Sequence, residues 1–364
     1  MKRIKTYILV YIVLLLVACN FNSKKEKNVY QKVLFDKREY KLKFNYKIKE
    51  QKSYKRKFKQ IKQEFLFKIG GINDTILISP ISIIEKKKKI YILDQGDYNI
   101  KILNLKGELI RSVGKYGKGP GEFLMPTRFS VSNSEKIIIA DYGVNRLSVF
   151  GDSLCSLIKS KYPISELSFI SDSEFIVLNF VVSETQSYIE KYDLQGNKIC
   201  RFASIYTNNL PSIISYNVSM QGDLLKTKKN NVVFVPGYFD HFVVFSPEGK
   251  IKYSIKKIAK MGIASIKFFR KNGMIVSNTK QLHNYNSTVT SFIISDKLFC
   301  YTIVRIDNKN KGIIDVYNLK DGEYVFSYRL PSTGSFTNIT FTDERNYIIR
   351  PDGSIDVYRV NYGE

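Results

Sequence analysis

A repeated strand–turn unit is the feature of this 364-residue chain that most limits its possible folds. Residues 89–94 read KIYILD and residues 136–141 read KIIIAD, and each run is followed by a short loop and a second apolar run. From residue 63 onward, short runs rich in Ile, Val, Phe and Tyr alternate with Gly, Asn, Asp and Pro. Such runs predict β-strands, and their repetition predicts several similar small sheets that bury their faces against one another.

The number of repeats predicts a closed ring. Candidate innermost strands begin near residues 81, 129, 167, 222, 290 and 336. The last unit contains three strands, whereas residues 63–69 form a strand that precedes the first unit. Placing strand 63–69 on the outside of the last unit closes the ring and removes an exposed edge. We therefore predict an all-β, six-bladed β-propeller of four-stranded antiparallel blades over residues 63–364. Seven blades are the alternative, because residues 250–290 are long enough to contain further strands.

The segment between the first two units carries the most specific motif. Residues 114–126 read GKYGKGPGEFLMP. This motif, with the Asp-ended strands and the Asn145-Arg146 pair, resembles the NHL repeat. Two units match that repeat well, and the others match by strand rhythm. The chain also resembles six-bladed propeller lipoproteins of the Bacteroidetes, related to NHL and TolB-like propellers. The resemblance implies a binding or scaffolding role in the cell envelope.

The N-terminus predicts a lipoprotein export signal. Residues 1–18 combine a basic start with an apolar run of about a dozen residues, which is shorter than the roughly 20 residues needed to span a bilayer. The run ends in LVAC, which resembles the lipobox of bacterial lipoproteins and implies cleavage before Cys19 and acylation of Cys19. An ordinary secretory signal or a signal anchor is the alternative. We expect an outer-membrane lipoprotein whose membrane partner is reached through Cys19, with the periplasmic or surface face left open.

Residues 19–62 form a strongly basic segment. Residues 24–62 contain 16 Lys or Arg and four Asp or Glu, within a chain of formal net charge +25. We expect a stalk, either simply solvated or attracted to anionic headgroups. The alternation of Leu42, Phe44, Tyr46 and Ile48 with polar residues leaves open an extra strand packed on the ring. A nucleic-acid partner is not expected, because the aromatic residues do not lie in a basic aromatic motif.

Loops that enter the inner strands and loops that join second to third strands are expected to gather on one face of the ring, where ligands usually bind. The candidate ligand residues there are Arg128, Tyr142, Tyr98, Tyr238 and His241. Further polar candidates are Asp97, Glu184, Asp240, Asn308 and Asp352. Arg128 could clamp a carboxylate or phosphate, or could form an ion pair within the protein.

Other polar residues are expected to be structural. Asp94 and Asp141 recur at equivalent positions, which is typical of side chains that accept loop N–H groups. The two His residues are far apart in sequence and the Cys residues are unclustered, so no metal site and no cofactor are expected. Cys155, Cys200 and Cys300 are expected to be buried thiols.

The expected function is that of a non-catalytic binding or scaffold module for a glycan, a peptide or an envelope protein. The alternative is a calcium-dependent hydrolase or lactonase, for which oxygen ligands exist but no motif places them on the ring axis. Its candidate ligands are Asn217, Asp223, Asp240 and Asn278. A purely structural subunit of an envelope complex is a third possibility. No catalytic residue is assigned.

Overall fold

The computed structural model describes residues 46–71, 74, 76–179, 189–203, 220–259, 267–271, 274–278, 287–306, 309–330 and 334–362. Cys19, Glu184, Asn217 and Asn308 lie outside these ranges, as does the side chain of Asn278. Across the described ranges, no helix has the length and apolar character needed to cross a membrane.

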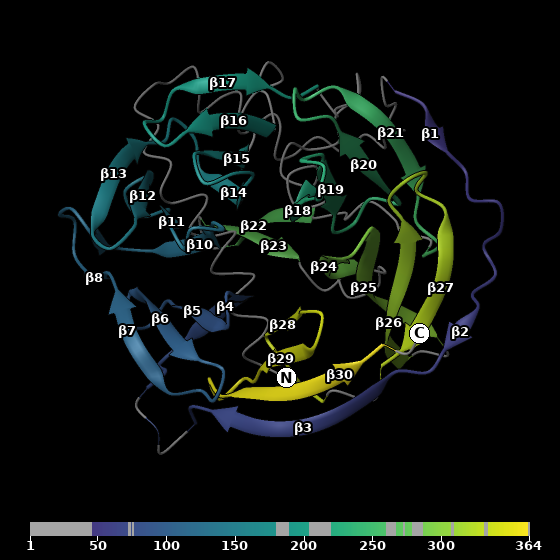
Figure 1. Cartoon of the computed structure of the whole chain (residues 1–364), viewed down its shortest axis with the longest axis horizontal. Helices are drawn as coiled ribbons and strands as arrows, with labels where there is room; N and C mark the ends of the chain where they lie inside the picture. Colours follow the sequence, from purple (N-terminus) through teal and green to yellow (C-terminus); the bar gives the residue numbers. More distant parts are fainter. Residues whose placement is uncertain are drawn as a thin grey trace.

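Six four-stranded antiparallel sheets stand around a central axis as the blades of a ring (Figure 1). Blade 1 comprises β4 (Pro80–Lys86), β5 (Lys89–Asp94), β6 (Asn99–Asn104) and β7 (Leu109–Val113). Blade 2 comprises β10 (Pro126–Val131), β11 (Ile137–Asp141), β12 (Arg146–Phe150) and β13 (Leu154–Lys159), and blade 3 comprises β14 (Ile164–Phe169), β15 (Glu174–Asn179), β16 (Ile189–Asp193) and β17 (Lys198–Arg201). Each blade begins with its innermost strand, which confirms the predicted order.

The other three blades follow the same plan. Blade 4 comprises β18 (Gly222–Lys226), β19 (Val232–Pro236), β20 (His241–Phe245) and β21 (Ile251–Lys256). Blade 5 comprises β24 (Ser287–Ile294), β25 (Lys297–Ile306), β26 (Lys309–Asn318) and β27 (Tyr324–Arg329). Blade 6 comprises β28 (Asn338–Phe341), β29 (Arg345–Ile349), β30 (Ile355–Asn361) and β3 (Lys62–Ile69). The prediction of a six-bladed propeller is confirmed.

Apolar side chains fill the seams between blades. A cluster of buried residues lies at each of the six seams, for example Phe123, Phe129 and Phe150 between blades 1 and 2. Strand residues alternate between the two faces of a sheet, and both faces of each blade meet a neighbour. The middle strands are therefore apolar on both faces, as in Val232–Pro236, which is buried throughout.

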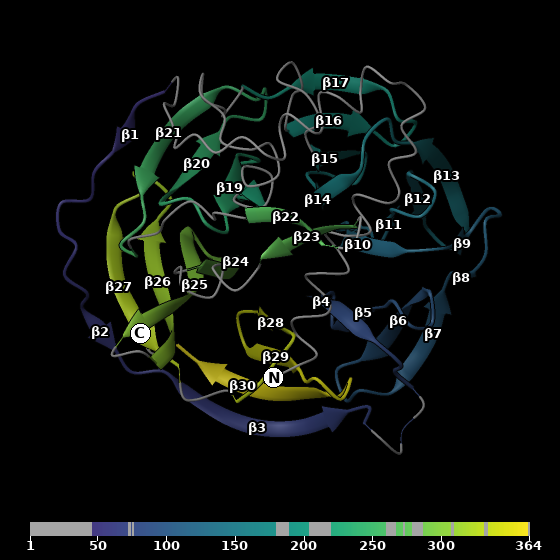
Figure 2. The ribbon, with the colours of Figure 1, turned by 180° about the vertical axis from the view of Figure 1, so that it is seen from behind.

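The ring closes through the strand that was predicted to close it. β3 pairs antiparallel with β30, and Ile69 lies opposite Ile355. The seven-bladed alternative is wrong, because the described part of residues 250–290 adds only a two-stranded sheet between blades 4 and 5. This sheet consists of β22 (Lys267–Lys271) and β23 (Met274–Asn278). In both views it projects over the centre of the ring (Figures 1 and 2).

Residues 46–61, here called the strap, run along the outer rim of blades 4 and 5 (Figure 2). β1 (Ile48–Lys49) pairs parallel with β21, and β2 (Phe58–Lys59) pairs parallel with β27. Part of the segment that we expected to be a stalk is thus an added fifth strand on two blades. Ile48 meets the expectation of an extra strand, whereas Leu42 and Phe44 lie outside the described residues.

Candidate functional site

The predicted ligand residues lie at one end of the ring but do not form a single pocket. Tyr98, Tyr142 and Tyr238 occupy loops between second and third strands, and His241 is the first residue of the third strand in blade 4. In an antiparallel blade these loops share one end of the ring. Tyr98 packs edge-on against Tyr116, with ring centroids 4.9 Å apart, and burial raises the pKa of Tyr238.

Arg128 joins two blades. Its Nε lies 3.1 Å from Glu166 Oε2 on β14, and its Nη1 donates to the Thr127 carbonyl oxygen at 2.8 Å. Burial raises the pKa of Glu166, and the charge of Arg128 opposes that rise. Among the two roles considered for Arg128, this geometry favours the internal ion pair.

His241 connects blade 4 to the strap. Its Nε2 lies 3.0 Å from the Tyr46 hydroxyl, its Nδ1 lies 3.0 Å from Asp240 Oδ1, and its ring stacks on Phe239. Burial lowers the pKa of His241, although Asp240 opposes this effect. Both imidazole nitrogens of His241 are thus within hydrogen-bonding distance of other protein groups.

Asp94 and Asp141 serve the loops, as the repeat predicted. Asp94 accepts N–H groups of Ile78, Ser79 and Gly96 at 2.7–3.2 Å. Asp141 accepts the equivalent N–H groups of Leu124, Met125 and Gly143, each at 2.9 Å. Asp97 and Asp352 likewise accept local hydrogen bonds, from Asn99 and from Ser354.

No group of three or more His, Cys, Asp or Glu side chains forms a metal-ligating cluster within the described residues. Asp240 is occupied by His241. Burial and the charge of Glu166 raise the pKa of Asp223 to about 7, so this carboxyl titrates near neutral pH. The prediction of three buried thiols holds for Cys300 alone, because Cys200 is half-buried and Cys155 is exposed.

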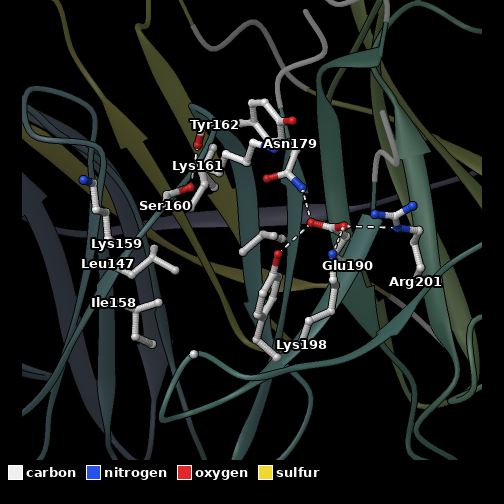
Figure 3. Close-up of a pocket in the computed structure, with 14 residues that line it drawn as sticks. Leu147, Ile158, Lys159, Ser160, Lys161, Tyr162, Asn179, Glu190, Lys198 and Arg201 are labelled. Carbon is white, nitrogen blue, oxygen red and sulfur yellow. Dashed lines mark hydrogen bonds and ion pairs between the residues drawn. The ribbon is translucent and has the colours of Figure 1, made fainter. Parts of the chain in front are cut away.

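A pocket of about 290 Å³ lies in the seam between blades 2 and 3 (Figure 3). Leu147 and Ile158 of blade 2 form one wall, and Val177 and Tyr192 of blade 3 form the other. The connector between the blades, residues 160–163, borders its mouth. The remaining lining residues include Lys159, Ser160, Lys161, Tyr162, Asn179, Glu190, Lys198 and Arg201.

The neighbouring seam explains why this pocket is open. Between blades 1 and 2, the fully buried Phe123 packs with Ile100 and Val113, and its ring lies directly against Gly114. In blade 1, Ile100 of the third strand lies opposite Val113 of the fourth, and in blade 2 Leu147 lies opposite Ile158 in the same way. Ile100 and Val113 are therefore the equivalents of Leu147 and Ile158.

The aromatic side chain comes from a long connector, residues 114–125, which contains β8 (Lys115–Tyr116) and β9 (Glu122–Phe123). The connector between blades 2 and 3 has only four residues. Leu147 and Ile158, which are buried in their own seam cluster, therefore border the pocket where their equivalents contact Phe123.

Glu190 is the centre of the polar side of the pocket. Its Oε2 accepts hydrogen bonds from Asn179 Nδ2 at 2.8 Å and from the Tyr192 hydroxyl at 2.7 Å, and its Oε1 lies 3.1 Å from Lys198 Nζ and 3.4 Å from Arg201 Nε. Glu190 is only 6% exposed. Burial acts to raise its pKa, but the bonds from Tyr192, Lys198 and Asn179 outweigh burial and lower it. Glu190 is therefore a charged carboxylate beneath a cationic rim.

Sequence reasoning missed this site, although one signal was present. Asn179 ends the second strand of blade 3, at the position that Asp94 and Asp141 hold in blades 1 and 2. In place of capping the connector, Asn179 bonds to Glu190. Pro236 and Ile349 hold the equivalent positions in blades 4 and 6, so the bond from Asn179 to Glu190, and not the loss of the Asp alone, distinguishes blade 3. Of the predicted residues, Tyr142 comes near it, in a small hollow that shares Ser160, Tyr162 and Ile164 with the pocket.

Comparison with known proteins agrees with the fold. Residues 71–171 match a family model described as a 6-bladed beta-propeller. No curated protein matches the chain significantly. A putative exported protein from Bacteroides fragilis aligns with a TM-score of 0.58 and 14% identity, over 87% of this chain and 99% of that one. A member of the DUF4221 family from Bacteroides vulgatus aligns with a TM-score of 0.55 and 11% identity, over 83% and 99%. The described strands and both comparisons lead to one conclusion: the chain is a six-bladed β-propeller.

Proposed function

We propose that this chain is a lipid-anchored propeller of the cell envelope that binds a ligand or partner without transforming it. The observation that carries the proposal is the seam pocket, in which cationic side chains border an open space on a rigid ring. Rigid scaffolds that carry small polar pockets are the usual form of binding sites.

The environments of the other candidate residues support binding over catalysis. Arg128 is paired with Glu166, His241 is held by Tyr46 and Asp240, and the repeated Asp residues hold loop amides. A nucleophile or a general base needs a reactive atom that can reach the substrate. In these residues the nitrogen and oxygen atoms that could react are already bonded to other groups of the protein.

The envelope location rests on the N-terminal sequence and on the exported relative. Residues 1–18 have the features of an export signal, and Cys19 ends a lipobox-like tetrapeptide. The structurally similar protein of Bacteroides fragilis is described as exported. The outer membrane is the proposed site of attachment.

Cell fractionation with Cys19→Ala tests the anchor. We expect the native chain in the outer-membrane fraction and the variant in a soluble envelope fraction, and protease treatment of intact cells then reports which face the ring occupies. Equally firm membrane association of the variant would refute lipid anchoring. Turnover of a candidate ligand by the purified protein would refute the non-catalytic role.

A further inference from the structure

We propose that the seam pocket between blades 2 and 3 binds an acidic saccharide, a uronate or a sulfated sugar. The acidic group would lie against Lys159 and Lys161 at the mouth, and sugar hydroxyls would face the hydroxyl groups of Ser160 and Tyr162. This inference rests on the proposed binding function and names its ligand class.

The charges around the pocket are unequal. Four cationic side chains line it, and Lys198 and Arg201 share the Glu190 carboxylate. Lys159 and Lys161 are exposed, neither forms an ion pair with a carboxylate of the described residues, and Lys161 Nζ lies 5.2 Å from the centroid of the Tyr162 ring. Two positive charges at the mouth therefore favour an anionic ligand group.

Glu190 determines what the rest of the ligand must be. The Glu190 carboxylate is an acceptor only, and Asn179, Tyr192, Lys198 and Arg201 already occupy its oxygens. It therefore repels a second anion, and ligand hydroxyls would meet neighbouring polar groups. A bare phosphate or sulfate ion in the pocket would face Lys161 on one side and Glu190 on the other. A molecule with an acidic group at one end and several hydroxyls at the other fits both parts. Acidic sugars have this arrangement, whereas a phosphorylated peptide side chain lacks the hydroxyls.

The apolar wall and the volume agree with a sugar. Leu147, Ile158 and Val177 lie buried behind the pocket, and the half-buried Tyr162 and Tyr192 supply the carbon surface that can pack against the C–H face of a pyranose ring. Small-molecule pockets usually measure about 300–1,000 Å³, so 290 Å³ is suited to one or two sugar rings. Asn179 and Ser160 supply further hydrogen-bonding groups at the edge.

Titration calorimetry on the full-length protein in detergent tests the proposal. The probes are digalacturonate, galactose 6-sulfate, the neutral disaccharide galactobiose and inorganic phosphate. We expect one of the two acidic sugars to bind at least about tenfold more tightly than galactobiose and phosphate. In Lys159→Ala/Lys161→Ala that binding should weaken about tenfold or more, whereas Lys118→Ala, an exposed lysine of the other connector, should leave it unchanged.

A second variant tests the pocket without changing its charge. Ile158→Phe adds an aromatic ring to the wall that Phe123 covers in the neighbouring seam, and it should abolish acidic-sugar binding while the melting temperature confirms folding. The proposal is wrong if neither acidic sugar binds, if galactobiose or phosphate binds as tightly, or if the folded Ile158→Phe variant binds normally. None of these results bears on the proposed membrane anchor, because cell fractionation tests the anchor separately.

Discussion

Arg56 of the strap forms a bidentate ion pair with Asp315 of blade 5. Nε lies 2.8 Å from Oδ1 and Nη2 lies 2.9 Å from Oδ2, and the Asp315 side chain is 1% exposed. The Ser327 hydroxyl also donates to Oδ1, at 2.6 Å. The carboxylate lies on the third strand of its blade, so the arginine reaches inward past the outer strand β27. The strap is therefore held to the ring by a buried charge pair as well as by strand pairing.

Arg56→Met should destabilise the ring strongly, because it leaves the Asp315 carboxylate buried without its cation. We expect a loss of about 3–5 kcal/mol, measured by denaturant unfolding. Lys55→Met, an exposed neighbour, should cost under about 0.5 kcal/mol. Arg56→Met/Asp315→Asn should recover part of the loss. Equal stability of the Arg56 and Lys55 variants would contradict a role for the ion pair.

Gln51 provides the second attachment of the strap and bridges two blades. Its Nε2 donates to the carbonyl oxygens of Lys256 at 2.7 Å and Gly322 at 3.1 Å, and its Oε1 accepts the N–H of Tyr324 at 2.8 Å. Gln51→Glu keeps the shape but sets a carboxylate oxygen against two carbonyl oxygens. We expect a loss of about 2–3 kcal/mol and faster proteolysis of residues 46–61.

The matched control for Gln51 is Gln60→Glu, because Gln60 is an exposed strap residue. The same charge change at Gln60 should leave both the unfolding transition and the rate of strap cleavage close to those of the native chain. If Gln51→Glu and Gln60→Glu lower stability and speed cleavage equally, the added negative charge in the strap, and not the loss of the Gln51 hydrogen bonds, would explain the destabilisation.

Asp141→Ala should destabilise blade 2 through its connector. The change removes the acceptor of the Leu124, Met125 and Gly143 N–H groups, and we expect a loss of about 2–3 kcal/mol in thermal or chemical unfolding. Asp152→Ala, at an exposed turn, should have little effect. A stable Asp141→Ala variant that had lost a ligand would instead support a functional role for the carboxylate.

The strand rhythm was sufficient to predict the ring, because short apolar runs separated by turn residues recur in every unit, whereas the Asp-ended strand recurs only in the first two. The predicted innermost strands near residues 81 and 129 correspond to β4 and β10, and strand 63–69 corresponds to β3. The strap was harder to place, since only four of its residues pair as strands and specific side chains such as Gln51 fix it. No local propensity reveals such contacts.

The pocket could not be predicted from its own residues, because it exists where a side chain is missing. Phe123 of the long connector belongs to the buried cluster of one seam, whereas residues 160–163 contribute no side chain to the buried cluster of the next. Asn179 holds the position of Asp94 and Asp141, but Pro236 and Ile349 replace the Asp in blades 4 and 6 as well, so the repeat alone does not single out blade 3.

Asp223, on the inner strand of blade 4, should make the stability of the ring depend on pH. Burial raises the pKa of this carboxyl to about 7, the charge of Glu166 adds to the rise, and Ser291 and Arg128 oppose it. In the unfolded chain an Asp ionises near pH 3.9. Between about pH 4 and 7 the folded state therefore holds a proton that the unfolded state has released. The free energy of unfolding falls as pH rises through this window.

Asp223→Asn should remove this dependence, because the amide stays neutral at every pH. We expect the melting temperature of the native chain to fall by a few degrees between pH 5 and 8, and that of the variant to fall less, as measured by scanning calorimetry. Asp152→Asn, at an exposed turn, should follow the native profile. A variant profile parallel to the native one would mean that Asp223 is already ionised at pH 5. The carboxyl would then be solvated along the ring axis, and the repulsion between Asp223 and Glu166 would be too weak to influence folding.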